Sequence, residues 1–399
     1  MRVGFFAHLP FHRPILEPVH AAVAARAPAL LSAAPRALVA FVPDVLVMAG
    51  HARLEHFRHQ LPRALMVNIR HGLVSKGVVG RLPRRRSARW FDFVCVGAES
   101  GLPSYEQHAV QPREYWHTGY PQLDPLFRRD PPPDLGLDRA RPTVLYAPTW
   151  NLGLSSAPML GARLVELIRR GAPGANVVIK PHPVIGDWRP RWMAWWERLA
   201  AAERGVHLVR ETHADVTPYM LAADALVSDA SSAIFEFLAL DRPIVLLTNP
   251  RHAADPAYMA ESILWNSRDV GIEAHAADQV PDALARALER PDPRAERRRH
   301  YAGILFGPFT DGRNHARVAE KILELEPAIA AGMLAPATLP PESAPSRLWH
   351  DVRTRLGVSR GLRRALFPAV EALRLRVRGL AASRAPRGGS VPSGEQGNA

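Results

Sequence analysis

Short, mostly apolar runs alternate with amphipathic segments along most of the chain. The runs at residues 43–50, 64–70 and 91–97 have the length and composition of strands that are buried on both faces. Apolar residues recur at helical spacing in the intervening segments, for example in residues 13–27. Strands that alternate with helices predict a mostly parallel sheet covered by helices on both faces.

This pattern breaks once and then repeats. Residues 130–142 are rich in proline and acidic residues, which is typical of a linker, and a second series of strands and helices follows them. We therefore expect an α/β protein with two Rossmann-like, doubly wound domains, at residues 1–138 and 139–326, facing a cleft. In such folds ligands bind beyond the carboxyl ends of the strands.

The last part of the chain, residues 327–399, has a different composition. A Pro/Ala-rich linker leads into a segment in which Leu, Val, Phe and Trp alternate with Arg, and the final residues are rich in Gly and Ser. Residues 346–387 hold eleven arginines but only two acidic residues, so this segment carries most of the net charge of +13. We expect a basic amphipathic helical tail that lies on an anionic membrane surface and a disordered end. The alternative is a solvated helix packed on the body or on a partner.

Several classes of function are disfavoured by what the sequence lacks. Cys95 is the only cysteine and lies in an apolar run, so a disulfide within the chain is impossible and a reducing compartment is expected. No stretch is long enough to span a membrane. The 17 histidines do not have metal-ligand spacing, and neither a GxSxG elbow nor a Gly-rich dinucleotide fingerprint occurs. We expect no metal and no cofactor, and no nucleic-acid partner because the charge is concentrated outside the body.

The most informative stretch is ALVSDASSAIFEFLALDRPIV, residues 225–245. It predicts a strand, a polar segment at residues 228–232, which we call the serine elbow, and a helix. Backbone N–H groups and the hydroxyls of Ser231 and Ser232 would together suit phosphate oxygens. Glu236 lies one turn beyond Ser232 on the same helix face, where its carboxylate could accept hydrogen bonds from ribose hydroxyls. The alternative is that Asp229 or Ser231 only caps the helix, and that Glu236 is a surface residue.

A second candidate group follows the strand at residues 64–70. His71 and Gly72 come directly after it, and Lys76 lies in the same glycine-containing loop. An imidazole at a strand end could act as a general base on a hydroxyl, and Lys76 could hold an anion. The alternative is a loop histidine bonded to a backbone carbonyl.

Two further groups also lie at strand ends. In IKPHP, the prolines on both sides of His182 stiffen the segment, so that Lys180 and His182 could face a pyrophosphate whose charge grows during reaction. In YAPTW, Thr149 could donate to a phosphate. A rigid loop with an incidental histidine and a strand-end cap are the respective alternatives.

Taken in order, these motifs resemble one family, the CDP-glycerol glycerophosphotransferases that build teichoic-acid-like and capsular polymers. The matching stretches span roughly residues 65–325: HGLVSKG, GYPQLD, YAPTW, IKPHP, SDASSAIFEFLALDRPIV and FTDGRNHA. Each motif alone has low specificity, but six in the right order are jointly specific.

The resemblance implies a fold of the glycosyltransferase B (GT-B) type, with an N-terminal acceptor domain and a C-terminal nucleotide-donor domain. It implies transfer of glycerol phosphate from CDP-glycerol, or a related CDP-polyol, to a hydroxyl of a cell-surface polymer or its lipid-linked precursor, with release of CMP and without a metal. By position, His71 matches the family's proposed base, His182 the histidine on the donor phosphates, and Ser231 and Ser232 the phosphate-binding serines. The expected place is the cytoplasmic face of the cell membrane.

The sequence departs from the family pattern at three positions, which leaves alternatives open. Trp150 stands where many members have a basic or aromatic residue followed by Arg, Ala230 where an aromatic residue is common, and Glu236 where Asp is frequent. One alternative is a nucleotide-sugar glycosyltransferase or sugar 2-epimerase of the same fold. Another is a non-catalytic assembly protein that keeps the fold.

Overall fold

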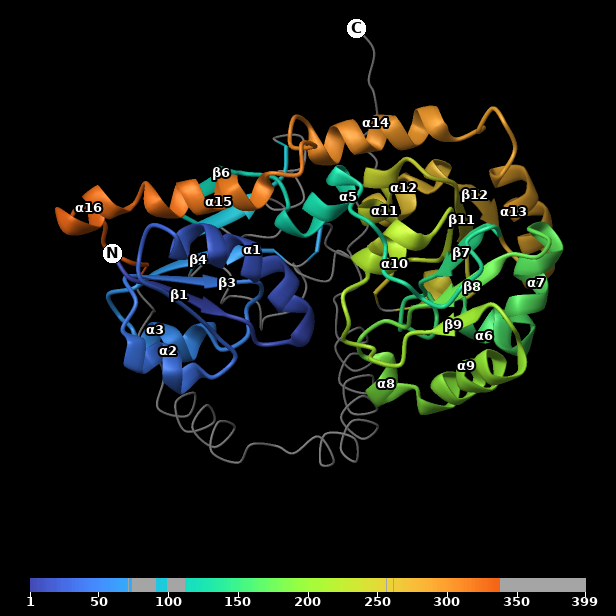
Figure 1. Ribbon diagram of the computed structural model, residues 1–399, viewed down its shortest axis with the longest axis horizontal. Coiled ribbons are helices and arrows are strands. Elements are labelled where there is room, and N and C mark those ends of the chain that lie inside the picture. Colours follow the sequence, from blue (N-terminus) through green and yellow to red (C-terminus); the bar gives the residue numbers. More distant parts are fainter. Residues whose placement is uncertain (71, 74–90, 99–111, 256, 261, 338–399) are drawn as a thin grey trace, which may run out of the picture. The chain divides into compact units, whose positions relative to one another are not determined.

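The protein contains two parallel sheets with helices on their faces, as the alternating pattern predicts. The structure is a computed structural model that describes residues 1–70, 72–73, 91–98, 112–255, 257–260 and 262–337 (Figure 1). Met1–Pro340 forms one compact unit that includes both sheets. The predicted division of the chain at residues 138 and 326 stays a prediction, and the predicted tail lies outside the described residues.

The first sheet has six parallel strands among the described residues, in the order β2-β1-β3-β4-β5-β6. Most of its side chains are apolar and fully buried, which is why these short runs form strands covered on both faces. The strands are β1 (Val3–Phe6), β2 (Ala29–Ser32), β3 (Val45–Met48), β4 (Leu65–Ile69), β5 (Phe93–Val96) and β6 (Glu114–His117).

The second sheet also has six parallel strands in the described part of the chain, in the order β12-β11-β10-β7-β8-β9. The strand order reverses between β7 and β10, which are the central pair and lie side by side. Such a reversal is the point at which doubly wound folds bind their ligands. The strands are β7 (Thr143–Tyr146), β8 (Asn176–Ile179), β9 (Val206–Leu208), β10 (Ala225–Ser228), β11 (Ile244–Leu247) and β12 (Ile272–Ala274).

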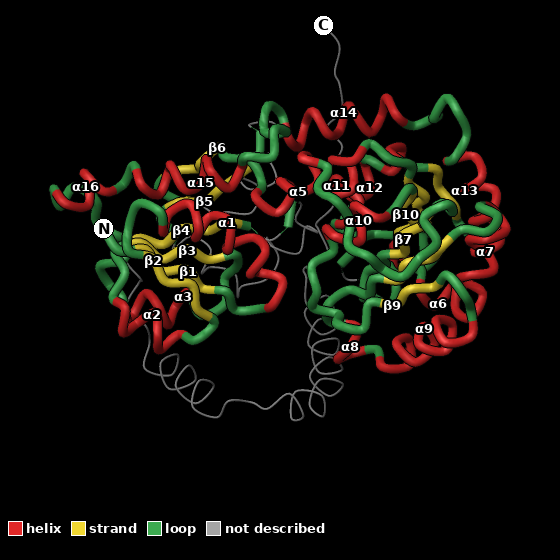
Figure 2. The backbone as a smooth tube through the Cα atoms, viewed as in Figure 1, coloured by secondary structure: helices red, strands yellow, loops and turns green. Residues whose placement is uncertain are grey.

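Helices lie on both faces of each sheet (Figure 2). Apolar side chains form a separate core on each face. On the first sheet, α1 (Arg13–Ala24) and α15 (Asn314–Leu323) contribute to one core, and α2 (Pro35–Phe41) and α3 (Leu54–Gln60) to the other. In α15, Val318 and Ile322 are fully buried one turn apart, and each contributes roughly 1.5–3 kcal/mol. A helix that follows the second sheet in sequence therefore packs into the core of the first.

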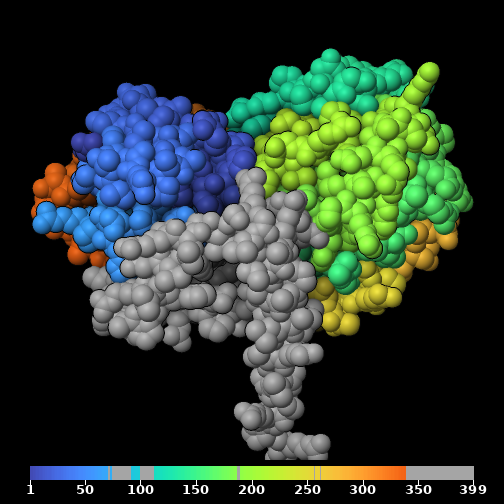
Figure 3. Space-filling model, turned by 90° about the horizontal axis from the view of Figure 1, so that it is seen from below, coloured from blue at the N-terminus to red at the C-terminus, as the bar shows by residue number. Residues whose placement is uncertain are grey.

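The second sheet is covered in the same way. One core includes side chains of α6, α7, α8, α9 and α13, and the other includes side chains of α5, α10, α11, α12 and α14. Figure 3 shows part of the surface that α8 and α9 form, in light green. The remaining helices are α5 (Asp124–Arg128), α6 (Ala157–Leu160), α7 (Leu164–Gly171), α8 (Ile185–Trp188), α9 (Pro190–Ala202), α10 (Thr217–Ala222), α11 (Ala233–Phe237), α12 (Ile263–Asn266), α13 (Val280–Ala287), α14 (Ala295–Phe306) and α16 (Glu326–Ala330).

Candidate functional site

The point where the strand order reverses in the second sheet brings two of the predicted motifs together. The YAPTW segment follows β7 and the serine elbow follows β10, and the paired strands place Tyr146 opposite Val227. Both segments therefore begin at the same edge of the sheet. The candidate site is built at this edge.

Asp229 joins these two segments. Its carboxylate is fully buried and accepts hydrogen bonds from the backbone N–H of Thr149 (2.8 Å) and from the backbone N–H and hydroxyl of Ser156 (2.7 Å each). Ser232 directly precedes α11, and its side chain makes no capping hydrogen bond. Of the two residues considered as caps, Ser231 accepts a 3.4 Å contact from the N–H of Ala233 at the start of α11, whereas the described hydrogen bonds of the Asp229 carboxylate go to the loop after β7. The carboxylate holds the loop after β7 in place.

A buried chain of hydroxyl groups extends this contact. Because the Ser156 hydroxyl donates to Asp229, it accepts the hydrogen bond from the Tyr146 hydroxyl, at 2.9 Å. Burial, and then the Asp229 charge, raise the pKa of Tyr146 well above its usual value, so the phenol stays protonated. Thr149 is fully buried beside this chain.

The serine elbow has free hydrogen-bond donors. Among the described residues, the backbone N–H groups of Ala230, Ser231 and Ser232 have no hydrogen-bond acceptor. The Ser231 hydroxyl accepts only a long contact from the N–H of Ala233, at 3.4 Å. α11 has five residues, so its dipole is small and the N–H groups themselves are the main attraction for an anion.

Lys180 lies at the end of β8 and is almost fully buried. Its ammonium donates to the backbone carbonyls of Pro181 (2.9 Å) and Thr212 (2.8 Å). Burial lowers its pKa to about 8, against the opposing effect of the carboxylates of Asp215 and Glu211. Its ammonium thus joins the backbone of the KPHP segment to that of Thr212.

The KPHP segment and the YAPTW segment lie near each other at the side-chain rings of His182 and Trp150. The His182 ring lies 6.3 Å from the Trp150 ring between centroids, and His182 Nδ1 is 3.4 Å from the backbone N–H of Val184. His182 is half-buried. The structure therefore brings two of the predicted clusters to the same place.

Glu236 is more than nine-tenths buried, which excludes the interpretation as a surface residue. No described residue forms a hydrogen bond with its carboxylate. Burial, and then the charge of Asp215, raise its pKa to about 8. Asp215 itself accepts hydrogen bonds from the N–H and hydroxyl of Thr217 at the start of α10. A buried carboxyl without a partner is an available ligand for a polar group.

Other predicted residues are only partly covered by the structure. His71 and Lys76 lie outside the described residues. Gly72 is described, and a Cβ atom placed on it would meet no atom of the described residues within 4 Å.

Three residues of the site are not among those predicted from the sequence. Asn249, after β11, donates to the carbonyls of Leu152 and Ser155 in the loop after β7. Asp255 accepts from the N–H of Gly153 at 3.1 Å. Arg268 donates to the backbone carbonyl of Asp229 at 2.7 Å. Only Asn249, which follows a strand end, had a recognisable signal.

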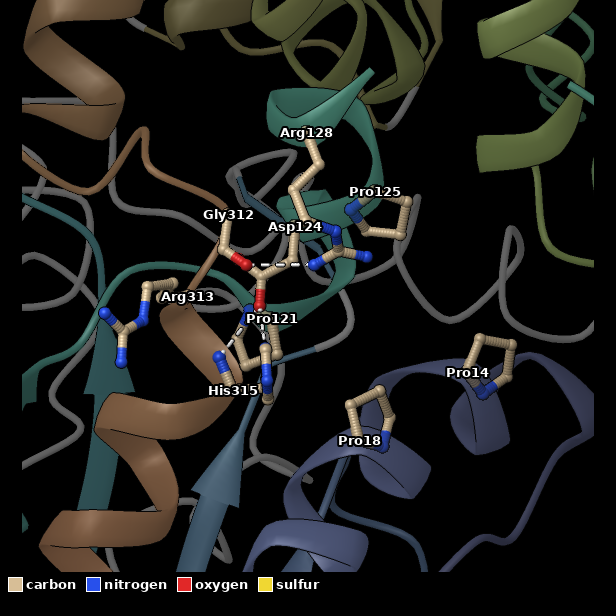
Figure 4. A pocket seen from close by; sticks show the side chains of 9 residues that line it. All are labelled: Pro14, Pro18, Pro121, Asp124, Pro125, Arg128, Gly312, Arg313 and His315. Carbon is tan, nitrogen blue, oxygen red and sulfur yellow. Dashed lines mark hydrogen bonds and ion pairs between the residues drawn. The ribbon is translucent and has the colours of Figure 1, made fainter. Parts of the chain in front are cut away.

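The GYPQLD and FTDGRNHA motifs contact each other. Asp124 accepts hydrogen bonds from the N–H groups of Asn314 (3.0 Å) and His315 (2.9 Å) and from the His315 ring (2.6 Å), as Figure 4 shows in part. A Cβ atom on Gly119, whose φ is +74°, would clash with Asn314. A cavity of about 420 Å³ is lined by Asp124, His315 and several prolines. With its carboxylate occupied by three donors, Asp124 joins α5 to α15.

Among the described residues, no group of three or more His, Cys, Asp or Glu side chains could hold a metal ion. The two doubly wound sheets define an α/β fold of the GT-B type. The sequence profile of the CDP-glycerol:poly(glycerophosphate) glycerophosphotransferases matches residues 83–324. The chain belongs to this family.

Individual relatives agree with this assignment. Teichoic acid ribitol-phosphate polymerase TarK of Staphylococcus aureus is 22% identical over 241 residues, which are 57% of this chain and 44% of TarK. The chain thus spans less than half the length of this curated relative. The structure of the wall teichoic acid polymerase TagF is similar with a TM-score of 0.63 at 14% identity, covering 81% of this chain and 88% of TagF.

The GT-B similarity extends to sugar epimerases. The S. aureus MnaA–UDP structure has a TM-score of 0.56 at 11% identity and covers 85% of this chain and all of MnaA. UDP-GlcNAc 2-epimerase from Neisseria meningitidis has a TM-score of 0.55 at 13% identity, covering 81% of this chain and all of that enzyme. At these identities the similarity is one of fold.

Proposed function

We propose that this protein transfers glycerol phosphate, or a related polyol phosphate, from a CDP-polyol to a hydroxyl of a cell-surface polymer or its lipid-linked precursor, releasing CMP. The observation that carries the proposal is the serine elbow. Three backbone N–H groups without acceptors and two serine hydroxyls lie at the strand reversal, in a chain of the glycerophosphotransferase family. These groups suit the pyrophosphate of the donor.

The reaction is a substitution at phosphorus. The acceptor oxygen forms a bond to the β-phosphorus of the donor, the bond from that phosphorus to the bridging oxygen breaks, and CMP leaves with the electron pair. His71 takes the proton of the acceptor hydroxyl. The charge that grows on CMP is stabilised by the N–H groups of the elbow, by Thr149 and by His182.

Lys180 supports this arrangement in two ways. Its ammonium holds the Pro181 carbonyl and so fixes the backbone just before His182. Its remaining N–H and its charge add positive potential near the phosphates. Gly72 and Lys76 belong to the same sequence motif as His71, and Lys76 would hold an anion of the acceptor.

Glu236 binds the ribose of the donor. Its carboxyl is buried without a hydrogen-bond partner, so a ribose hydroxyl would supply the missing contact. TagF was soaked with CDPG, and TarK is named as a ribitol-phosphate polymerase, so both CDP-glycerol and CDP-ribitol are candidate donors.

A donor panel tests the proposal. Thermal shift should increase with CDP-glycerol or CDP-ribitol more than with UDP or UDP-sugars, and the stabilising donor should yield CMP when an acceptor is present. His71→Ala should abolish CMP release but keep donor binding, whereas His207→Ala, a substitution on β9, should change neither. Release of UDP from a UDP-sugar would favour the glycosyltransferase or epimerase alternative. No response to any nucleotide would favour a non-catalytic assembly protein.

We also propose that the protein acts at the cytoplasmic face of the membrane through its basic tail. Within the described residues, no helix has the length and apolar character needed to cross a bilayer. The arginines of residues 346–387 would each contribute about 1 kcal/mol at an anionic surface. Truncation after residue 336 should abolish sedimentation with vesicles that contain phosphatidylglycerol. Undiminished sedimentation would contradict the membrane proposal.

A further inference from the structure

Arg268 is a buried cation directly beside the serine elbow. Only 9% of its side chain is exposed, and it follows α12 in a short loop before β12. None of the predicted motifs includes it. Its place at the donor site therefore comes from the fold.

The guanidinium spans the ends of three neighbouring strands. It donates to the Asp229 carbonyl after β10 (2.7 Å), to the Thr248 hydroxyl after β11 (2.6 Å) and to the Glu273 carboxylate in β12 (2.9 Å). The Trp265 ring covers it, with the guanidinium carbon 5.4 Å from the ring centroid. This arrangement uses the planar fork of arginine, because each of its three nitrogens has a different partner.

The contact to Asp229 fixes the backbone where the elbow begins. The next three residues, Ala230 to Ser232, carry the N–H groups that have no acceptor. A phosphate gains most from donors that are already held in position, because binding then orders no additional backbone. Arg268 supplies this fixation through the Asp229 carbonyl, while the Asp229 carboxylate is bonded to the loop after β7.

We infer that Arg268 is a positioning residue of the donor site: its guanidinium holds the serine elbow in the conformation that binds the donor pyrophosphate. The inference rests on the proposed function. Arg268 acts through the backbone and not as a phosphate ligand, because Glu273 pairs with its charge. The arrangement of its partners, and not the charge alone, is what the site requires.

Two substitutions separate position from charge. Arg268→Gln removes the positive charge and the hydrogen bonds to the three partners. Arg268→Lys keeps the charge but cannot reach three partners in different directions. Both should weaken binding of CDP-glycerol by calorimetry about tenfold, in the full-length protein. The matched control is Arg298→Lys: Arg298 is also buried and pairs with Asp241 and Asp292, but it does not contact the elbow. This control should lower stability and leave donor binding within about twofold of wild type.

Hydrogen exchange provides a readout that needs no donor. In both Arg268 variants, the N–H groups of Ile234 and Phe235, which donate to the carbonyls of Ser231 and Ser232 in the elbow, should exchange at least tenfold faster, and in Arg298→Lys they should not. Wild-type affinity in Arg268→Lys would overturn the inference, as would unchanged exchange in both variants. If the wild-type protein binds no CDP-polyol, the proposed function fails, and hydrogen exchange alone decides whether Arg268 positions the elbow.

Discussion

Replacing Asp229 by asparagine tests whether its carboxylate anchors the loop after β7. The substitution keeps the size of the side chain but replaces one acceptor oxygen by an NH₂ group. Three donors, from Thr149 and Ser156, converge on the two carboxylate oxygens. In asparagine the single oxygen can serve the two Ser156 donors, and the NH₂ group must then face the N–H of Thr149.

The expected loss of stability follows from these contacts. One charge-assisted hydrogen bond disappears, at about 1.5–3 kcal/mol, and the two that remain become neutral and lose about 1 kcal/mol each. Removing a buried charge returns part of this loss. We therefore expect the free energy of unfolding to fall by about 3 kcal/mol.

Asp255→Asn is the matched control. Asp255 accepts backbone N–H groups of Gly153 and Ala257, but it is half-buried, so water can replace what the amide loses. Its substitution should lower the free energy of unfolding by less than about 1 kcal/mol. Both variants are compared by urea unfolding, monitored by tryptophan fluorescence, at equal m-values. If Asp229→Asn is no less stable than Asp255→Asn, the anchoring role is refuted.

Three further predictions concern the stability of the protein. Burial raises the pKa of Glu236 from 4.5 in the unfolded chain to about 8, so wild-type stability should fall as pH rises between these values, and urea midpoints of Glu236→Gln should lack this fall. The pKa of Lys180 is lowered from 10.5 to about 8, so wild-type stability should increase as pH rises from 8 to 10.5; Lys180→Met should show no such increase. Asp124→Ala should cost about 3 kcal/mol in urea unfolding, against about 1 kcal/mol for His315→Ala, which removes one of its three hydrogen bonds; equal losses would contradict this.

The fold could be predicted from sequence because its signals are local. Apolar runs followed by polar strand ends indicate a parallel sheet, and the linker at residues 130–142 indicates that the pattern starts again. The return of α15 to the first core could not be predicted in this way. Its buried residues, Val318 and Ile322, show that one helix face is apolar, but not which sheet it covers.

The site could be predicted in part for a similar reason. Strand ends with serine, histidine or lysine are visible in the sequence, and the parallel sheet brings them to one edge. The direction in which a side chain turns depends on partners far along the chain. Asp229 looks like a helix cap locally, but its donors lie 73–80 residues away. Arg268 has no local signal, because its role arises from the ends of three strands.

The position of Asp229 also explains how an acidic residue can belong to the proposed phosphate site. If its carboxylate capped α11, it would occupy the N–H groups of the elbow and repel the phosphates. Its carboxylate instead accepts hydrogen bonds from the loop after β7, and its backbone carbonyl accepts one from Arg268. The attraction between Arg268 and Asp229 partly offsets the negative charge. The oxygen atoms of Asp229 accept hydrogen bonds from other groups, so they do not occupy the backbone N–H groups of the elbow. These N–H groups therefore stay available for an anion.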